Sequence, residues 1–210
     1  MLNQILFLVI GWLLGLLSPA IYDAVTKKRR QAEVKRGIQV ELAELRFNLA
    51  SAGFTVASGA GGWDREYLQW LKGLLDSYRG ARDEDRRPLL ETVARLNDLD
   101  DQQLAAAART MGPPPAAAAL RKQHLPYLDS HLEVVSSLRP ETQRKLLEVQ
   151  AQLGVINELV DDIRFCLGKA FDSLPPSTRQ AIDASLQTSY RAVLQSSRTT
   201  ADLIGGLNLG

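Results

Sequence analysis

The sequence contains little cysteine and little histidine, and these shortages exclude several kinds of site. Cys166 is the single cysteine, so no disulfide framework can form within the chain, and a reducing compartment is the expected environment. The two histidines, His124 and His131, are separated by Pro126, which breaks the helical spacing that would bring them together. Neither stands in a His-x-x-x-His or Glu-x-x-His pattern. We therefore predict no metal site.

The short motifs that carry catalysis are missing as well. The glycine-rich stretch at residues 58–62 is not followed by the Gly-Lys-Ser/Thr of a phosphate-binding loop. No serine or cysteine stands in a recognisable nucleophile context. Glu158, Asp161 and Asp162 lie close together, but carboxylates without a histidine or a second pair do not indicate acid-base catalysis. We predict that the protein is not an enzyme, with no catalytic residues and no cofactor.

Strand patterns are absent too, and helical ones take their place. Nothing alternates with period two for more than a few residues, so essentially no sheet is expected. Apolar residues recur instead at spacings of three and four along much of the chain. The predicted fold class is all-α, with an N-terminal transmembrane helix that continues into a cytoplasmic antiparallel helical bundle.

The longest apolar run, at residues 5–22, contains no Asp, Glu, Lys, Arg or His. As a helix rising about 1.5 Å per residue, it would be roughly 27 Å long, close to the ~30 Å hydrocarbon core of a bilayer. The cations follow the run, so the positive-inside rule keeps the C-terminal body in the cytoplasm. A signal peptide cleaved after Ala20 is the alternative, but no Lys or Arg precedes the run. We predict a single-pass anchor at residues 1–25 in a bacterial cytoplasmic membrane.

Small residues mark one face of the predicted anchor. Gly11, Gly15 and Ser18 recur at the spacing that lets two membrane helices approach closely. Glycine is also common in membrane helices that make no such contact. The pattern therefore leaves open whether copies of the chain associate through this face.

A basic collar follows the anchor and consists of Lys27, Lys28, Arg29, Arg30, Lys35 and Arg36. Residues 37–210 have 19 cations and 22 anions, a net charge of −3. A mildly acidic body is a poor nucleic-acid binder, because binding to nucleic acid requires cations that neutralise phosphates. We expect the collar to contact anionic lipid headgroups, and we expect no nucleic-acid partner.

Glycine, proline and helix-capping residues divide the rest of the chain into predicted helices. The first half, residues 26–112, should contain a helix that leaves the membrane and ends near Gly53, with a joint at residues 58–62. Pro88 is expected as the first residue of a later helix. Asp100 and Gln103 fit a capping box that opens another.

The second half, residues 113–210, begins after Gly112 with three prolines. A weak helix is expected over residues 116–124 and is ended by Pro126, and the last helix, at about 178–204, should open with a Ser177–Gln180 capping box.

A heptad seam predicts a long helix at about 140–174. Its apolar residues alternate at spacings of three and four, and they include Leu146, Val149, Leu153, Ile156, Val160, Ile163 and Leu167. The seam can be the core of a bundle within one chain or a contact between copies. The short Pro175–Ser177 connection favours antiparallel packing within one chain.

Four stretches resemble a group of uncharacterised bacterial single-pass proteins with helical cytoplasmic bodies. They are GWLLGLLSPAIYD running into KKRR, QVELAELRFNLA, QAQLGVINELVDDIRF and SYRAVLQSSRTTADLI. The resemblance implies an anchor and an all-helical body, and it implies no activity.

Two functions are compatible with these features. The favoured one is a membrane-tethered scaffold that recruits or organises a protein partner at the inner face of the membrane. The alternative is an oligomerising membrane effector, of the toxin or phage-defence type, that permeabilises the membrane. One helix cannot enclose a pore, so the alternative requires a homo-oligomer.

Overall fold

The computed structural model describes residues 2–60, 63–111, 120–170, 175–207 and 209. Within its helices, the side chains of residues 2–11, 13, 14, 16–21, 59, 60, 109–111 and 170 are not described. The elements in these ranges are α1 (Leu2–Ala60), α2 (Arg65–Ser77), α3 (Asp83–Asp98), α4 (Asp101–Met111), α6 (Pro126–Asp129), α7 (Leu132–Val135), α8 (Pro140–Ala170) and α9 (Pro176–Gly205). No strand occurs among the described residues, so the predicted all-α class is confirmed.

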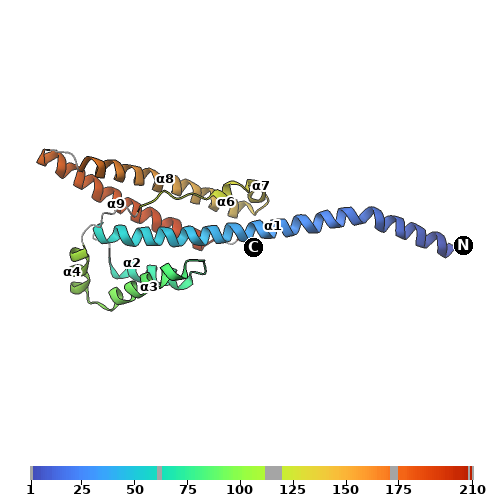
Figure 1. Ribbon diagram of the computed structural model, residues 1–210, viewed down its shortest axis with the longest axis horizontal. Helices are drawn as coiled ribbons and strands as arrows, with labels where there is room; N and C mark the ends of the chain where they lie inside the picture. The colour runs from blue at the N-terminus through green and yellow to red at the C-terminus, as the bar shows by residue number, and fades with distance from the viewer. Residues whose placement is uncertain (1, 61–62, 112–119, 171–174, 208, 210) are drawn as a thin grey trace.

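The long helix α1 organises the fold (Figure 1). Helix α9 packs along one side of it and α8 packs mainly on α9, while α2, α3 and α4 lie on the other side of α1. α9 runs antiparallel to both α1 and α8. The N-terminal part of α1 extends away from the other helices as a single rod. Helices from both halves of the chain therefore assemble around the C-terminal part of α1.

Two hydrophobic clusters lie on different faces of α1. The larger joins one stripe of α1 to α8 and α9, and its α1 members are Val34, Ile38, Leu42, Leu45, Leu49 and Val56. The smaller contains Phe47, Ala50 and Ala57 of α1 together with Trp63 and the apolar faces of α2 and α3. Because both stripes follow helical spacing, one uninterrupted helix can serve both clusters.

The heptad seam of α8 faces the larger cluster. Six of its seven predicted residues are buried, and Leu167 is partly buried against the same cluster. α8 packs mainly on α9 of the same chain, and α9 contributes Leu186, Tyr190, Val193 and Ile204. The seam therefore lies in an intramolecular core in this structure.

In the first half, the predicted start of α4 is confirmed and the predicted end of α1 is wrong. At the start of α4, the Gln103 amide donates to Asp100 Oδ1 at 2.8 Å and the Asp100 amide donates to Gln103 Oε1 at 3.1 Å, as the capping box requires. α1 does not end near Gly53 but continues to Ala60. Gly53 stays helical because it is buried beside Tyr67 of α2, where its lack of a side chain permits the close approach. The predicted joint at residues 58–62 is thus helical up to Ala60, and residues 61–62 lie outside the described residues.

Prolines caused the remaining errors. Pro88 lies inside α3 rather than at its start, because α3 begins at Asp83, where the acidic first turn of Asp83, Glu84 and Asp85 favours a helix N-terminus. The predicted capping box at Ser177 is wrong, since α9 already begins at Pro176 with Pro175 as its N-cap and no side-chain cap bond. Pro126 opens the short helix α6 instead of ending a helix, and the described residues before it, 120–125, are not helical.

The predicted boundary between the two halves, at residues 112–115, lies outside the described residues. Within the part that is described, no helix is both long enough and apolar enough to cross a membrane. Most side chains of residues 5–22 lie outside that part, although the backbone from Leu2 onward is helical.

Candidate functional site

The predicted membrane contact lies on the projecting part of α1. The side chains of Gly11 and Ser18 are outside the described residues. Gly15 is exposed, and a Cβ added to it would meet no atom within 4 Å. The small-residue face is therefore uncovered at Gly15.

The basic collar also lies on α1 before the helix enters the core. Lys27, Lys28, Arg29, Arg30 and Arg36 are exposed, and Lys35 is half-buried. Val34 is the first buried residue of α1 among those described. The collar thus occupies the stretch where the rod meets the body.

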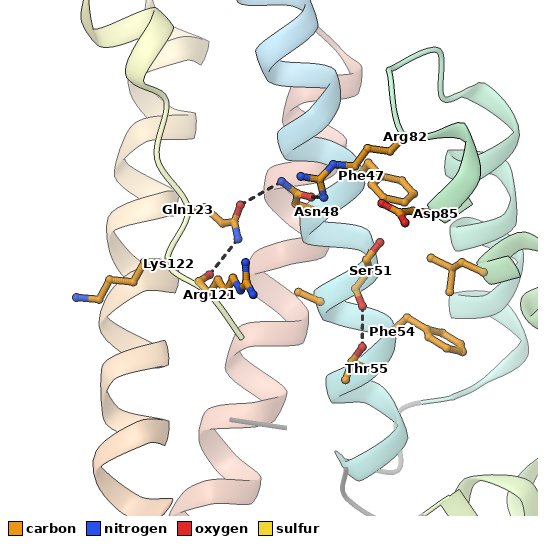
Figure 2. Close-up of a pocket in the computed structure, with 12 residues that line it drawn as sticks. Phe47, Asn48, Ser51, Phe54, Thr55, Arg82, Asp85, Arg121, Lys122 and Gln123 are labelled. Atoms are coloured by element: carbon orange, nitrogen blue, oxygen red, sulfur yellow. Dashed lines mark hydrogen bonds between the residues drawn. The ribbon is translucent and has the colours of Figure 1, made fainter. Parts of the chain in front are cut away.

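A groove on the body brings together residues that the sequence pattern did not connect. Its cavity volume is about 530 Å³. α1 supplies the floor, with Phe47, Asn48, Ser51, Ala52, Phe54 and Thr55. Figure 2 shows Arg82 and Asp85 on one side of the floor and Arg121, Lys122 and Gln123 on the other. The site therefore consists of three separate segments of the chain.

Helix α8 holds the wall formed by the 120–125 segment. The Asn157 side chain pairs with both backbone groups of Gln123, because its Oδ1 accepts from the Gln123 amide at 2.8 Å and its Nδ2 donates to the Gln123 carbonyl at 2.9 Å. Arg164 donates to the Leu120 carbonyl at 3.1 Å. These bonds satisfy backbone groups that a non-helical segment would otherwise leave open, and they fix the position of Arg121 between them.

The opposite wall is tied to α1 through Arg82. Its guanidinium donates to Asn48 Oδ1 at 2.9 Å and forms an ion pair with Glu44 at 3.4 Å. Tyr78 donates its hydroxyl proton to Glu44 Oε1 at 2.5 Å. Burial, followed by the hydrogen bond to Glu44, raises the pKa of Tyr78 above its ordinary value. Glu44 thus connects the α2–α3 turn to α1 and orients Arg82 over the floor.

The walls carry more positive than negative charge. Arg82, Arg121 and Lys122 face a single acid, Asp85, among the lining residues. The Lys122 ammonium is not directed into the groove, because it pairs with Asp161 of α8 at 2.6 Å and points away from α1 in Figure 2. The Arg121 guanidinium has neither an ion pair nor a hydrogen bond among the described residues. Arg121 therefore carries the uncompensated charge of the site.

The floor combines polar and aromatic groups. Ser51 Oγ is buried and has no hydrogen-bond partner among the described residues. Asn48 Nδ2 donates to Gln123 Oε1 at 3.4 Å, which is a long bond across the groove (Figure 2). The Phe54 ring stacks on Trp63, with centroids 4.9 Å apart, so its position is fixed. The groove thus offers an apolar surface beside unsatisfied polar groups.

The histidines do not form a second site. His131 stacks on the Tyr127 ring at 4.3 Å, and its Nδ1 lies 2.8 Å from the Tyr127 carbonyl oxygen. His124 lies on a smaller cavity of about 230 Å³ beside Asp129 and Gln150. Among the described residues, no group of three or more His, Cys, Asp and Glu side chains is arranged to hold a metal ion.

Sequence reasoning missed Arg82, Arg121 and Gln123 for a physical reason. Arg82 was assigned to no predicted element and Arg121 to a predicted weak helix, and in both places an arginine normally points into solvent. The available signal was the spacing of the polar residues Asn48, Ser51 and Thr55, which recur three and four positions apart and so lie on one side of the helix. Such a stripe indicates a polar contact on α1, but not the segments that complete it.

Comparison of the chain with protein-family models, with curated proteins and with solved structures finds no match. The resemblance to bacterial single-pass proteins therefore remains a prediction.

Proposed function

We propose that this protein is a membrane-tethered helical scaffold that recruits a partner at the inner face of a bacterial cytoplasmic membrane. The observation that carries the proposal is the continuity of α1, which is a single helix from Leu2 to Ala60. Its N-terminal part lies away from every other helix in Figure 1, while its C-terminal part is the centre of the body. A binding body and an anchor would thus be rigidly connected.

The chemistry of the projecting part supports an anchor. Residues 5–22 are almost entirely apolar. Burying a Leu, Ile, Val or Phe side chain contributes about 1.5–3 kcal/mol, so this rod is much more stable in hydrocarbon than in water. The collar follows at the position where cations would meet headgroups, each contributing about 1 kcal/mol on an anionic surface. Membrane lipid is accordingly one partner and a protein is the other.

Cysteine labelling tests the proposed topology in the full chain. Asn3→Cys in a Cys166→Ala background places a unique thiol before the apolar run, and Glu148→Cys in the same background places one on the exposed face of α8. In intact spheroplasts, a membrane-impermeant maleimide should label Cys at position 3 and should label position 148 only after permeabilisation.

Either of two results would overturn the anchor. One is equal labelling of both positions before permeabilisation, and the other is release of the full-length protein into the supernatant by sodium carbonate. A chain with a mature N-terminus at Ile21 would indicate a cleaved signal peptide instead.

The open space around Gly15 favours one second candidate, the oligomerising membrane effector. In this function several copies would associate through Gly11, Gly15 and Ser18 and permeabilise the membrane. Gly15→Leu would block that contact without touching the body, because nothing lies within 4 Å of the added Cβ. Loss of both chemical crosslinking and membrane depolarisation in this variant supports the effector, and unchanged crosslinking rules out this contact.

A further inference from the structure

We infer that the groove between α1, Arg82 and the 120–125 segment binds a small soluble organic anion, in which a phosphate or carboxylate group adjoins an apolar group. A ligand of this kind would bind in addition to the lipid and protein partners proposed above. The volume of the groove, about 530 Å³, falls within the range of roughly 300–1,000 Å³ that is common for small-molecule sites.

The first step of the argument is electrostatic. Among the described residues, the Arg121 guanidinium has no partner, and the one acid that lines the groove, Asp85, lies on the opposite wall. A guanidinium presents five donors in a fixed fork that matches two oxygens of a phosphate or carboxylate. An oxyanion at this wall would therefore supply the missing charge and hydrogen bonds.

The second step is that the groove is already ordered. Arg82 is held by Glu44 and Asn48, and the backbone beside Arg121 is held by Asn157. A ligand that enters a preformed site loses less free energy to the ordering of side chains. Ser51 Oγ, which is buried without a partner on the floor, is one more polar group in the groove that is not satisfied within the described chain.

The third step explains the apolar part of the ligand. Phe54 and Leu89 line the groove and are only partly buried, although both pack against the smaller hydrophobic cluster. The stack of Phe54 on Trp63 keeps its ring in place. An inorganic ion would leave this surface in water, whereas an aromatic or branched group would cover it.

Geometry selects a soluble source of the anion over a lipid headgroup. Ser51 lies 15 helical residues beyond Arg36, the last residue of the collar. At roughly 1.5 Å per residue, this places the floor of the groove about 22 Å from the nearest end of the collar. Headgroups of the membrane at the collar would not reach that far. This choice of source rests on the proposed anchoring, whereas binding of an added solute does not.

Calorimetry on the full-length chain in phosphatidylcholine nanodiscs tests the inference with phenyl phosphate as the probe. Benzyl alcohol serves as the neutral analogue, and inorganic phosphate as the analogue without a ring. We expect phenyl phosphate to bind and the two analogues to bind at least ten-fold more weakly. Phenylacetate, compared in the same way, shows whether the site prefers a carboxylate.

Two arginine variants make the test specific. Arg121→Gln should weaken the binding of phenyl phosphate about ten-fold or more, since it removes a charged hydrogen-bond donor. Arg144→Gln removes an exposed arginine of α8 outside the groove and should leave the affinity unchanged. Arg121→Lys keeps the charge but not the fork, so it should restore only part of the affinity.

The inference is overturned if phenyl phosphate does not bind at millimolar concentration or if Arg121→Gln binds it as tightly as the unaltered chain. Displacement of phenyl phosphate by phosphatidic acid built into the disc would overturn the inference that the bound anion is a soluble compound and not a lipid headgroup. A chain that fails the labelling test but binds phenyl phosphate through Arg121 would retain the site and lose the anchor. Failure of the proposed anchor can therefore be distinguished from failure of the proposed anion site.

Discussion

Asn157 holds Gln123 by both of its backbone groups, accepting from its amide at 2.8 Å and donating to its carbonyl at 2.9 Å. This pairing joins the middle of α8 to a segment that forms no helix of its own. It is the most direct link between the heptad helix and the wall of the groove.

We predict that Asn157→Ala loosens the 120–125 segment. The change leaves a backbone donor and acceptor of Gln123 without partners, which costs about 1–3 kcal/mol if they stay buried. Hydrogen exchange should become at least ten-fold faster at the Gln123 amide, and phenyl phosphate should bind less tightly. The neighbouring exposed Glu158→Ala is the control and should change neither. Unaltered exchange in Asn157→Ala would contradict the assigned role.

Two buried tyrosines should respond in opposite directions to removal of their hydroxyl. Tyr67 Oη is buried without a hydrogen-bond partner among the described residues, so Tyr67→Phe should stabilise the protein by about 1 kcal/mol. Tyr78 donates to Glu44 and accepts from the Arg82 amide at 3.0 Å, so Tyr78→Phe should destabilise it by about 1–2 kcal/mol. Urea unfolding at pH 7 measures the change in unfolding free energy for both variants. A destabilised Tyr67→Phe would contradict the unsatisfied hydroxyl.

The same tyrosines predict loss of stability in alkali. Burial raises the pKa of Tyr67 and of Tyr78 above the ordinary value, so the folded state holds these protons more tightly than the unfolded state. Their contribution is complete below the unfolded pKa of about 10 and decreases as the pH rises above it, towards the folded pKa. Unfolding free energy measured between pH 9 and 11, about one unit on either side of that value, should fall less steeply for Tyr67→Phe than for the unaltered chain.

Truncation of a buried side chain tests whether the heptad seam packs within one chain. Ile163 is fully buried, and Ile163→Ala should cost about 2–5 kcal/mol through lost burial and the cavity that remains. Phe165, two residues on, is 66% exposed, so Phe165→Ala should cost under about 1 kcal/mol. The difference should not depend on protein concentration, because the seam packs within one chain. A concentration-dependent cost would instead indicate a contact between copies.

The collar predicts a salt-dependent attraction to anionic membranes. Replacing Lys27, Lys28, Arg29 and Arg30 by Gln removes four exposed cations, each contributing about 1 kcal/mol near an anionic surface. The variant should cosediment less with phosphatidylserine vesicles than the unaltered chain at low salt, and the difference should shrink at high salt. Arg139 and Arg144, which are also exposed but belong to the body, provide the control when changed to Gln. Equal loss in both variants would argue against a specific collar.

The sequence predicted the elements whose stability is local and repeated. The seam of α8 and the apolar stripe of α1 recur over several turns, so their period identifies both the helix and its buried face. The capping box of Asp100 and Gln103 needs only residues three positions apart, and it was found. These features depend on neighbours in sequence.

The features that were missed depend on distant residues. The helix continues through Gly53 because Tyr67 and α9 pack against it, and no pattern around Gly53 records that contact. The 120–125 segment can stay non-helical because Asn157 and Arg164 satisfy some of its backbone groups from α8. The groove combines three segments whose separation in sequence hides their proximity, so its charge became visible only in the fold.

The central position of α1 determines the order in which the protein can fold during synthesis. α1 and α2 to α4 leave the ribosome first and can complete the smaller hydrophobic cluster, apart from its α9 residues, which include the buried Ala201 and the partly buried Leu194. The other stripe of α1 stays uncovered until α8 and α9 emerge, and at about 5–20 residues per second that interval lasts several seconds or more. A nascent chain with an exposed apolar stripe is prone to aggregate, so co-translational chaperones should contact this protein before α9 emerges.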